Sequence, residues 1–383
     1  MGTSIRPHTF SNKIADIYRM KKSICFLPLL LLFFVLQAQD TKKNERFNII
    51  AYYAGDAASV DNYPMEKLTH IIYSFCHLKG NKLNIDNAGD TATILKLTGL
   101  KKRLPELKVL LSLGGWGGCK TCSPVFSKQE NRKEFAASVK KLCEDFNADG
   151  IDLDWEYPAI PGPPGHPYKP EDRENFTALI KTLRNTLGTK YEISFAAGGF
   201  TTFLQESVEW NKVMPLIDRV NLMTYDLVHG YSTVTGHQTP LYSTPEQTES
   251  ADHAVKYLDS IGVPKNKMVI GAAFYARIFK VDTNFNNGLY QTGKFYKGVS
   301  YKGFDRAQLE QEGYTYYWDR VAKAPFMYNP NTLLFYTYDD EKSLREKTKY
   351  ALENGLNGIM FWQLTDDNDN HDLLNAIYKT VEK

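Results

Sequence analysis

Three carboxylic acids alternate with apolar residues between positions 149 and 158, where the chain reads DGIDLDWEYP. On a β-strand side chains point alternately to opposite faces, so Asp152, Asp154 and Glu156 would share one face. Neighbouring carboxyl groups raise one another's pKa, and burying their charges is costly. An arrangement with this cost suggests a function, and the chemistry that paired carboxyl groups support is proton transfer.

The elements around this segment decide whether its acids are buried. Short runs rich in β-branched and aromatic residues alternate with segments of helical spacing, which predicts parallel strands joined by helices. Eight such runs indicate an α/β fold, a (β/α)8 or TIM barrel. We expect strands at 48–53, 70–76, 108–113, 150–157, 191–197, 220–225, 268–275 and 358–362. We expect helices at 128–148, 171–187, 244–261 and 341–354.

The alternative for the acidic segment is a solvated edge strand in an antiparallel sheet. In a parallel barrel both faces of a strand are buried, which weakens that alternative. Glu156 then lies at the carboxyl end of its strand, where barrel enzymes carry catalytic residues.

The alternation of strands and helices fails once, between 278 and 331, where Tyr, Phe, Gly and Lys dominate. This segment is too long for an ordinary loop. We expect a small α+β insertion at 279–331, rising from the seventh strand of a catalytic barrel that spans 45–383.

Motifs on several predicted strands together resemble glycoside hydrolase family 18. The pattern Asp-x-x-Asp-x-Asp-x-Glu on the fourth strand is the signature of that family. Further family motifs are SLGGW at 112–116, MTYD at 223–226, YAR at 275–277 and MFW at 360–362. The resemblance covers nearly all of the chain from Tyr52 onward, and the insertion is similar to one that deepens the cleft in one subgroup. It implies a retaining chitinase that hydrolyses β-1,4 linkages between N-acetylglucosamine units without a cofactor.

The resemblance also implies catalytic roles. Family members use the substrate's own acetamide oxygen as nucleophile instead of a second carboxylate. Glu156 would protonate the leaving oxygen and later activate water. Asp154 would bind the acetamide nitrogen and stabilise the oxazolinium intermediate, while Asp152 would share a proton and tune its neighbour. Tyr225 would hold the acetamide oxygen in line for attack.

A second group of residues is expected to bind the sugar chain. Trp362 resembles the floor on which the central sugar stacks, and Trp116, Tyr52 and Phe75 would extend an aromatic track. For Phe75, ordinary core packing is an equally good interpretation. The other expected binding residues are Gly115, Met223, Asp226, Tyr275, Arg277 and Met360.

The first 39 residues have the layout of an export signal. A basic start at Met20 is followed by an apolar segment at 24–36 and a small residue at Ala38. This apolar segment is shorter than the roughly 20 residues of a membrane span. We expect translation to start at Met20 and the mature protein to be secreted, extracellular or periplasmic, without membrane attachment.

The charge balance bears on the partners. After residue 38 the chain carries 41 Lys and Arg against 43 Asp and Glu. This near-neutral balance argues against a nucleic acid as the main partner. We expect a monomer whose partners are chitin or chito-oligosaccharides.

The cysteines suggest a disulfide and no metal. In an exported protein, the spacing of Cys119 and Cys122 is compatible with a small disulfide loop, and no second pair of that spacing supports a zinc site. Cys76 and Cys143 lie in apolar contexts and are expected to be buried free thiols. The run DDNDNH at 366–371 lacks the glycine and distal glutamate of a calcium loop, so we expect helix capping there.

Two other functions stay open. A chitinase-like lectin would bind chito-oligosaccharides without cutting them, but such proteins typically lose the terminal glutamate, which is present here as Glu156. An endo-β-N-acetylglucosaminidase acting on N-glycans shares the acidic motif and the mechanism. The insertion and the aromatic track favour a linear polymer over a branched glycan, by analogy.

Overall fold

The computed structural model describes residues 1–4 and 46–383. Residues 5–39, which make up most of the predicted export signal, lie outside the described residues. Residues 47–383 form one compact unit. In the part that is described, no helix combines the length and the hydropathy needed to cross a bilayer.

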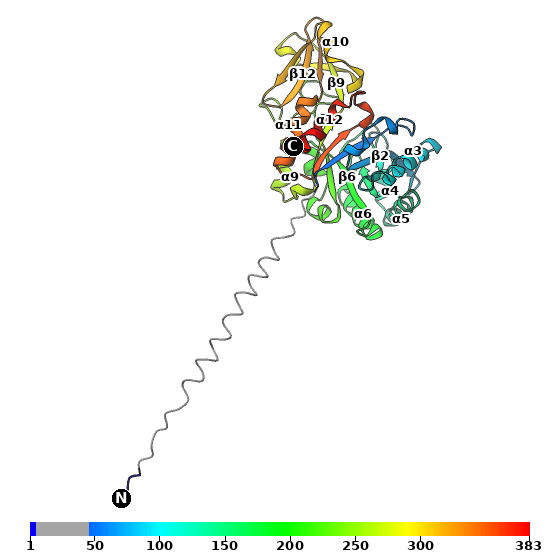
Figure 1. Ribbon diagram of the computed structural model, residues 1–383, viewed down its shortest axis with the longest axis vertical. Coiled ribbons are helices and arrows are strands. Elements are labelled where there is room, and N and C mark those ends of the chain that lie inside the picture. The colour runs from blue at the N-terminus through cyan, green and yellow to red at the C-terminus, as the bar shows by residue number, and fades with distance from the viewer. Residues whose placement is uncertain (5–45) are drawn as a thin grey trace. The chain divides into compact units, whose positions relative to one another are not determined.

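Eight parallel strands close into the predicted TIM barrel (Figure 1). Closure occurs at β1 (Asn48–Tyr53), which pairs with β14 (Gly358–Trp362) on one side and with β2 (His70–Lys79) on the other. The remaining barrel strands are β4 (Lys108–Gly114), β5 (Gly150–Asp154), β6 (Glu192–Gly198), β7 (Arg219–Met223) and β8 (Met268–Ala273). A short strand, β3 (Lys82–Asn84), adds to β2 outside the barrel.

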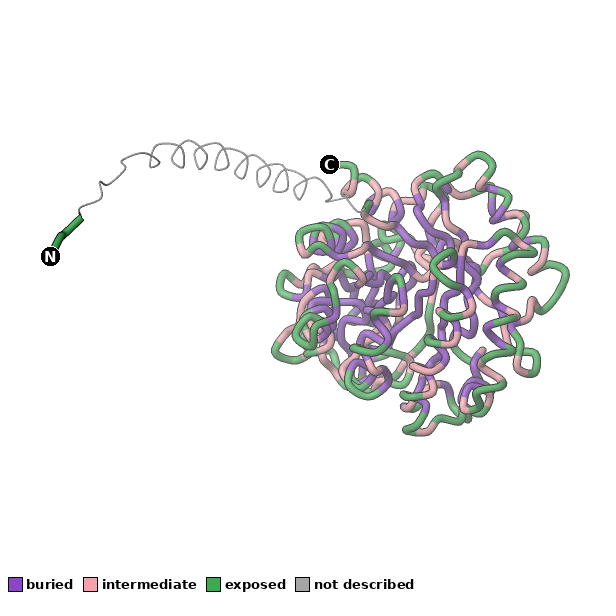
Figure 2. Tube along the Cα trace, turned by 90° about the horizontal axis from the view of Figure 1, so that it is seen from below, coloured by how far each residue is buried: buried purple, intermediate pink, exposed green. Residues whose placement is uncertain are grey.

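The helices of the barrel cover its strands, and buried residues follow the inner segments of the unit (Figure 2). These helices are α3 (Ala88–Gly99), α4 (Cys122–Phe126), α5 (Gln129–Phe146), α6 (Asp172–Leu187), α7 (Thr201–Glu206), α8 (Trp210–Val213), α9 (Ala251–Ser260), α11 (Glu341–Glu353) and α12 (Asp372–Val381). The predicted helix at 244–261 is wrong in its start. Helix α9 begins at Ala251 because the Ser250 side chain caps it by accepting the amide of His253.

Strand β5 shows the predicted alternation. Ile151, Leu153 and Trp155 are buried in the core between the strands and the helices. The Trp155 ring lies 5.6 Å from Phe126 in α4 and 6.3 Å from Phe176 in α6. This outward apolar face fixes the opposite face of β5 toward the barrel interior.

The insertion after the seventh barrel strand is an antiparallel five-stranded sheet in the order β10-β9-β13-β12-β11. Its strands are β9 (Tyr275–Val281), β10 (Gly293–Ser300), β11 (Thr315–Asp319), β12 (Ala324–Asn329) and β13 (Leu334–Thr337), with α10 (Arg306–Gln311) before β11. The sheet extends beyond 279–331 on both sides. It starts earlier because β9 follows β8 after a single residue, Phe274, and it ends later because β13 closes it at Thr337. Arg277 and Tyr275 therefore belong to the sheet of the insertion.

Candidate active site

Asp152 lies in the barrel interior with no exposed surface. Its carboxylate accepts four hydrogen bonds, two at each oxygen. The donors are Tyr52 Oη (3.1 Å) and Ser112 Oγ (3.0 Å) at Oδ2, and Ser194 Oγ (2.6 Å) and Asn221 Nδ2 (3.1 Å) at Oδ1. Burial raises the pKa of Asp152, and these hydrogen bonds offset part of that rise because they stabilise the charged form.

Asp154 lies between the other two acids in the sequence, and no comparable set of hydrogen bonds from the described residues holds its carboxyl group. It is 4% exposed, and its Oδ1 is buried without a hydrogen-bond partner among the described residues. Burial and the charges of Glu156 and Asp152 raise the pKa of Asp154 well above its ordinary value. A buried acceptor of this kind calls for a proton on the carboxyl group or for a donor from a ligand.

Glu156 is 8% exposed and lies just beyond the end of β5. Burial raises its pKa to about 7, a hydrogen bond with Tyr157 works against the rise, and the charge of Asp226 adds to it. A carboxyl group with this pKa is protonated in a substantial fraction of molecules at neutral pH, as a proton donor must be.

Tyr225 follows the end of β7 and comes close to the acids of β5. Burial and the nearby charges of Asp154 and Glu156 raise its pKa well above the ordinary value, so its hydroxyl stays protonated. Its ring packs edge-on against Tyr275 at 6.2 Å, and its hydroxyl lies 4.0 Å from the Met360 sulfur. Tyr225 therefore presents a neutral hydroxyl donor beside the carboxyl groups.

Asp226 and Arg277 form a bidentate pair that joins the barrel to the insertion. Arg277 Nε and Nη2 each donate to one Asp226 oxygen at 2.7 Å. The guanidinium lies 5.1 Å from the Tyr275 ring and 5.6 Å from the Phe295 ring. Both side chains of the pair keep some exposure, 33% for Asp226 and 25% for Arg277, so polar groups of a ligand can reach them.

The predicted aromatic residues fall into two groups. Trp362 is partly exposed and stacks on Phe75 at 5.5 Å, and Trp116 is 55% exposed. Tyr52 is 1% exposed and uses its hydroxyl on Asp152, so it lies beneath the surface on which a ligand would rest. Met223 and Met360 are likewise buried in the interior of the barrel.

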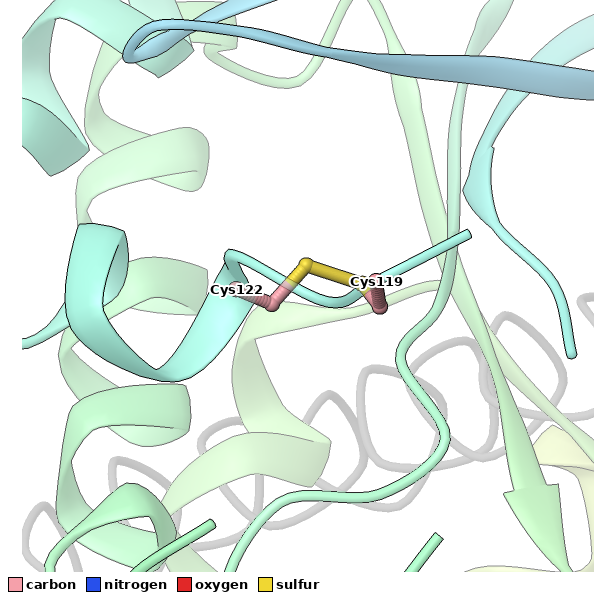
Figure 3. Close-up of a disulfide and its surroundings, with 2 residues drawn as sticks. All are labelled: Cys119 and Cys122. Atoms are coloured by element: carbon pink, nitrogen blue, oxygen red, sulfur yellow. A yellow bond between two sulfur atoms is a disulfide. The ribbon is translucent and has the colours of Figure 1, made fainter. Parts of the chain in front are cut away.

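Trp116 is carried by a tight loop after β4. Gly115 has φ of 79°, and its amide donates to the Asp154 carbonyl at 3.0 Å. A side chain at Gly115 would come within 2.3 Å of the Phe75 ring, so glycine permits this approach. The structure joins Cys119 and Cys122, which links the end of this loop to the start of α4 (Figure 3).

Residues 48–367 match the family described as Glycosyl hydrolases family 18. The chain belongs to this family. It is 30% identical over 440 residues to chitinase A1 of Niallia circulans, a match that covers 95% of this chain and 62% of that protein. It is 29% identical to chitinase B of Serratia marcescens, with 82% of this chain and 76% of that protein covered. The protein is thus a glycoside hydrolase related to chitinases, and it spans less than two thirds of chitinase A1.

Solved structures agree with this assignment. A family 18 N-acetylglucosaminidase from Paenibacillus barengoltzii superposes with a TM-score of 0.78 at 33% identity, over 88% of this chain and all of that one. The Group IV chitinase of Ostrinia furnacalis in complex with allosamidin superposes with a TM-score of 0.81 at 25% identity, over 88% of this chain and 99% of that one.

Sequence reasoning assigned no individual role to four residues of this family 18 site. Three of them, Ser112, Ser194 and Asn221, donate to Asp152 from the neighbouring strands β4, β6 and β7. A polar residue at an inward position of an otherwise apolar strand is the signal that could have identified them. The fourth is Gly271, in the middle of β8, where a glycine marks a close approach.

A cavity of about 710 Å³ lies beside the site. Its lining includes Ala54, Tyr63, Lys302 and Thr365, but none of the three acids of β5. The amide of Ala54 donates to the side chain of Gln363, the residue after Trp362. This hollow is therefore next to the Trp362 surface and separate from the carboxyl groups.

Other sequence predictions fall outside the site. Cys76 and Cys143 are buried free thiols, as expected. The capping prediction at 366–371 is confirmed, because the Asp367 carboxylate accepts the amides of Leu373 and Leu374 at the start of α12.

Gly271→Ala tests whether the position of Tyr225 controls hydrolysis. A Cβ at 271 would lie 2.9 Å from Tyr225 Cε1 and 2.7 Å from the Leu222 carbonyl oxygen, so the Tyr225 ring must move. We expect the rate of oligosaccharide hydrolysis to fall by at least about tenfold, because small displacements of positioning groups are costly.

Gly99→Ala is the matched control, since a Cβ at this position of α3 would meet nothing within 4 Å. It should leave the rate unchanged. Full activity of Gly271→Ala with an unchanged Tm would show that the Tyr225 position is unimportant.

Proposed function

We propose that this protein is a chitinase that hydrolyses β-1,4 linkages between N-acetylglucosamine units with retention of configuration at the anomeric carbon. The observation that carries the proposal is the buried Asp154 Oδ1, which has no partner among the described residues and lies near Glu156, whose pKa is about 7. The acetamide N–H of an N-acetylglucosamine unit would supply the hydrogen bond that Asp154 Oδ1 lacks among the described residues. The adjacent acid would then protonate the glycosidic oxygen.

Glu156 would act first as acid and then as base. Burial keeps the carboxyl group protonated near neutral pH, so it can donate to the leaving oxygen as the bond to the anomeric carbon breaks. The acetamide oxygen of the same sugar would bond to the anomeric carbon and form an oxazolinium ion. The Glu156 carboxylate would then remove a proton from the water that opens this ring.

Asp154 and Asp152 would stabilise the positive charge of the intermediate. Because both oxygens of Asp152 already accept two donors each, we infer that Asp152 stays ionised. This differs from the proton sharing that the sequence resemblance implied for Asp152. The resting proton would belong to Asp154, and loss of that proton to solvent would leave an anion beside the oxazolinium nitrogen, while Glu156 remains a carboxylate that can accept a proton from water.

Tyr225 and the Asp226–Arg277 pair would orient the reacting sugar. The Tyr225 hydroxyl is a neutral donor that can hold the acetamide oxygen in line with the anomeric carbon. Asp226 and Arg277 would bind sugar hydroxyl groups with the remaining lone pairs of the Asp226 oxygens and with the Arg277 N–H groups that their mutual hydrogen bonds do not use.

The aromatic surface supports a chain of sugars as ligand. Trp362 would carry the reacting sugar, with Phe75 stacked against the indole ring and Trp116 exposed on the loop after β4. Flat aromatic faces suit the C–H faces of pyranose rings and lose little side-chain entropy on binding. Named relatives that are chitinases, and one bound to allosamidin, add to this support.

We also propose that the mature chain is exported, as the residues before position 39 suggest. The catalytic unit would span 45–383 with the insertion inside it, and it would act as a monomer on chitin or chito-oligosaccharides. Hydrolysis of N-glycans is the second candidate, because it would use the same acids.

Glu156→Gln separates hydrolysis from binding. Residues 40–383 would be incubated with chitohexaose and, in parallel, with an N-glycosylated protein, and products would be followed by mass spectrometry. The unsubstituted protein should release shorter N-acetylglucosamine oligomers from chitohexaose. Glu156→Gln should lose at least about a hundredfold in rate, because the proton donor is gone, while it still binds the oligosaccharide.

The control is Glu130→Gln on the exposed surface of α5, which should keep full activity. Near-normal turnover by Glu156→Gln would remove this residue from its role. Glycan release without cleavage of chitohexaose would favour the endoglycosidase, and binding without any cleavage would favour a lectin.

The pH profile tests the state of Glu156. Because the acid must be protonated, kcat/KM should fall as the pH rises through about 7. Tyr157→Phe removes the hydrogen bond that lowers the pKa of Glu156, so the basic limb should move to higher pH. Tyr242→Phe, a substitution on the loop beside Tyr350, should leave the limb in place. A basic limb that moves to lower pH in Tyr157→Phe would contradict the assignment.

A further inference from the structure

A completely buried ion pair connects helix α11 to segments that lie close to the site. Lys347 of α11 donates to Asp339 Oδ2 at 2.6 Å, and neither side chain has exposed surface. The free-energy cost of removing two charges from water exceeds their mutual attraction unless further hydrogen bonds satisfy the remaining donors and acceptors of the pair. An apolar pair of similar size would fill the space as well, which suggests that this pair has a positional role.

The hydrogen bonds that complete the pair come from α11 itself and from two other segments. Asp339 Oδ1 accepts from Ser343 Oγ at 2.7 Å, and Oδ2 accepts from the Ala273 amide at 3.0 Å at the end of β8. Lys347 Nζ also donates to Thr239 Oγ1, in the long loop after β7. The pair thereby ties α11 to the end of β8, just before Tyr275, and to the loop that follows β7.

Thr239 transmits this constraint to the site. Its hydroxyl, which accepts from Lys347, lies 3.2 Å from the Thr224 carbonyl oxygen and 3.1 Å from Asp339 Oδ2. Asp339 Oδ2 already accepts from Lys347 and the Ala273 amide. The single proton of Thr239 is therefore within reach of both acceptors, and the contact with the Thr224 carbonyl is the one that leads to the site.

The backbone at Thr224 depends on such side-chain contacts. The pairing of β7 with β8 ends at Leu222 and Ile270, two residues before Thr224. Beyond that point, Thr224 Oγ1 donates to the Gly271 carbonyl and accepts the Gly271 amide, both at 2.9 Å. Thr224 is thus held by its own hydroxyl on one side and by Thr239 on the other, immediately before Tyr225.

We propose that Thr239, held by the Asp339–Lys347 pair, is a positioning residue that sets the peptide between Thr224 and Tyr225 and so aims the Tyr225 hydroxyl at the substrate. This inference rests on the proposed role of Tyr225 in aligning the acetamide oxygen. A misaligned Tyr225 lowers the rate of the chemical step and leaves the aromatic surface that binds the sugar chain unchanged. The effect therefore falls on kcat and spares KM.

Thr239→Val removes the hydroxyl while it keeps the shape of the side chain. With chitohexaose as substrate, we expect kcat to fall by about tenfold or more, as for other misplaced positioning groups. KM should stay within about twofold, because ground-state binding is retained. Thr239→Ser restores the hydroxyl and should recover most of kcat.

Thr98→Val is the matched control for loss of a buried hydroxyl. Thr98 is 6% exposed, and its hydroxyl donates to the Ile94 carbonyl within α3, outside the site. Thr98→Val should lower Tm at unchanged kcat. The inference is overturned if Thr239→Val keeps the unsubstituted kcat, if Thr98→Val loses kcat equally, or if Thr239→Ser fails to restore it. Failure of the proposed function would instead show in the unsubstituted protein, as an absence of chitohexaose cleavage.

Discussion

The structure depends on the burial of three carboxyl groups on β5 and just beyond its end. Burying a charged group is unfavourable in free energy, and the three acids differ in how their surroundings offset it. Asp152 receives four hydrogen bonds from β1, β4, β6 and β7 and can keep its charge. Asp154 has an oxygen without a partner among the described residues and a strongly raised pKa, and Glu156 has a pKa of about 7. The barrel thus places three neighbouring carboxyl groups in different surroundings, of which one has four hydrogen bonds, one a strongly raised pKa and one a pKa of about 7.

The ends of β7 and β8 supply the second half of the site. Tyr225 and Asp226 follow β7, while Tyr275 and Arg277 lie on β9 of the insertion sheet directly after β8. The Asp226–Arg277 pair joins these two parts, and Gly271 leaves room for the Tyr225 ring. The insertion therefore contributes side chains, Tyr275 and Arg277, to the site itself.

Much of this could be predicted because it has a local signal. The alternation along β5 placed the three acids on one face, and the family motifs marked the residues at the strand ends. The roles of Ser112, Ser194 and Asn221 as donors to Asp152 were missed because one serine or asparagine in an apolar strand forms no repeating pattern. Lys347 lies in the predicted helix at 341–354, where nothing in the helical spacing indicated that it is fully buried against Asp339. Its partner Thr239 is 108 positions away, and sequence periodicity does not report contacts of that kind.

The anomeric form of the first product tests the central claim most directly. Proton NMR would follow chitohexaose during the first minutes of hydrolysis by residues 40–383, before mutarotation mixes the anomers. Attack by the acetamide oxygen followed by water predicts that the new reducing ends are initially β. Initially α products would contradict the account, because they would require water to displace the leaving group directly, without the intermediate that Asp154 and Tyr225 are proposed to stabilise.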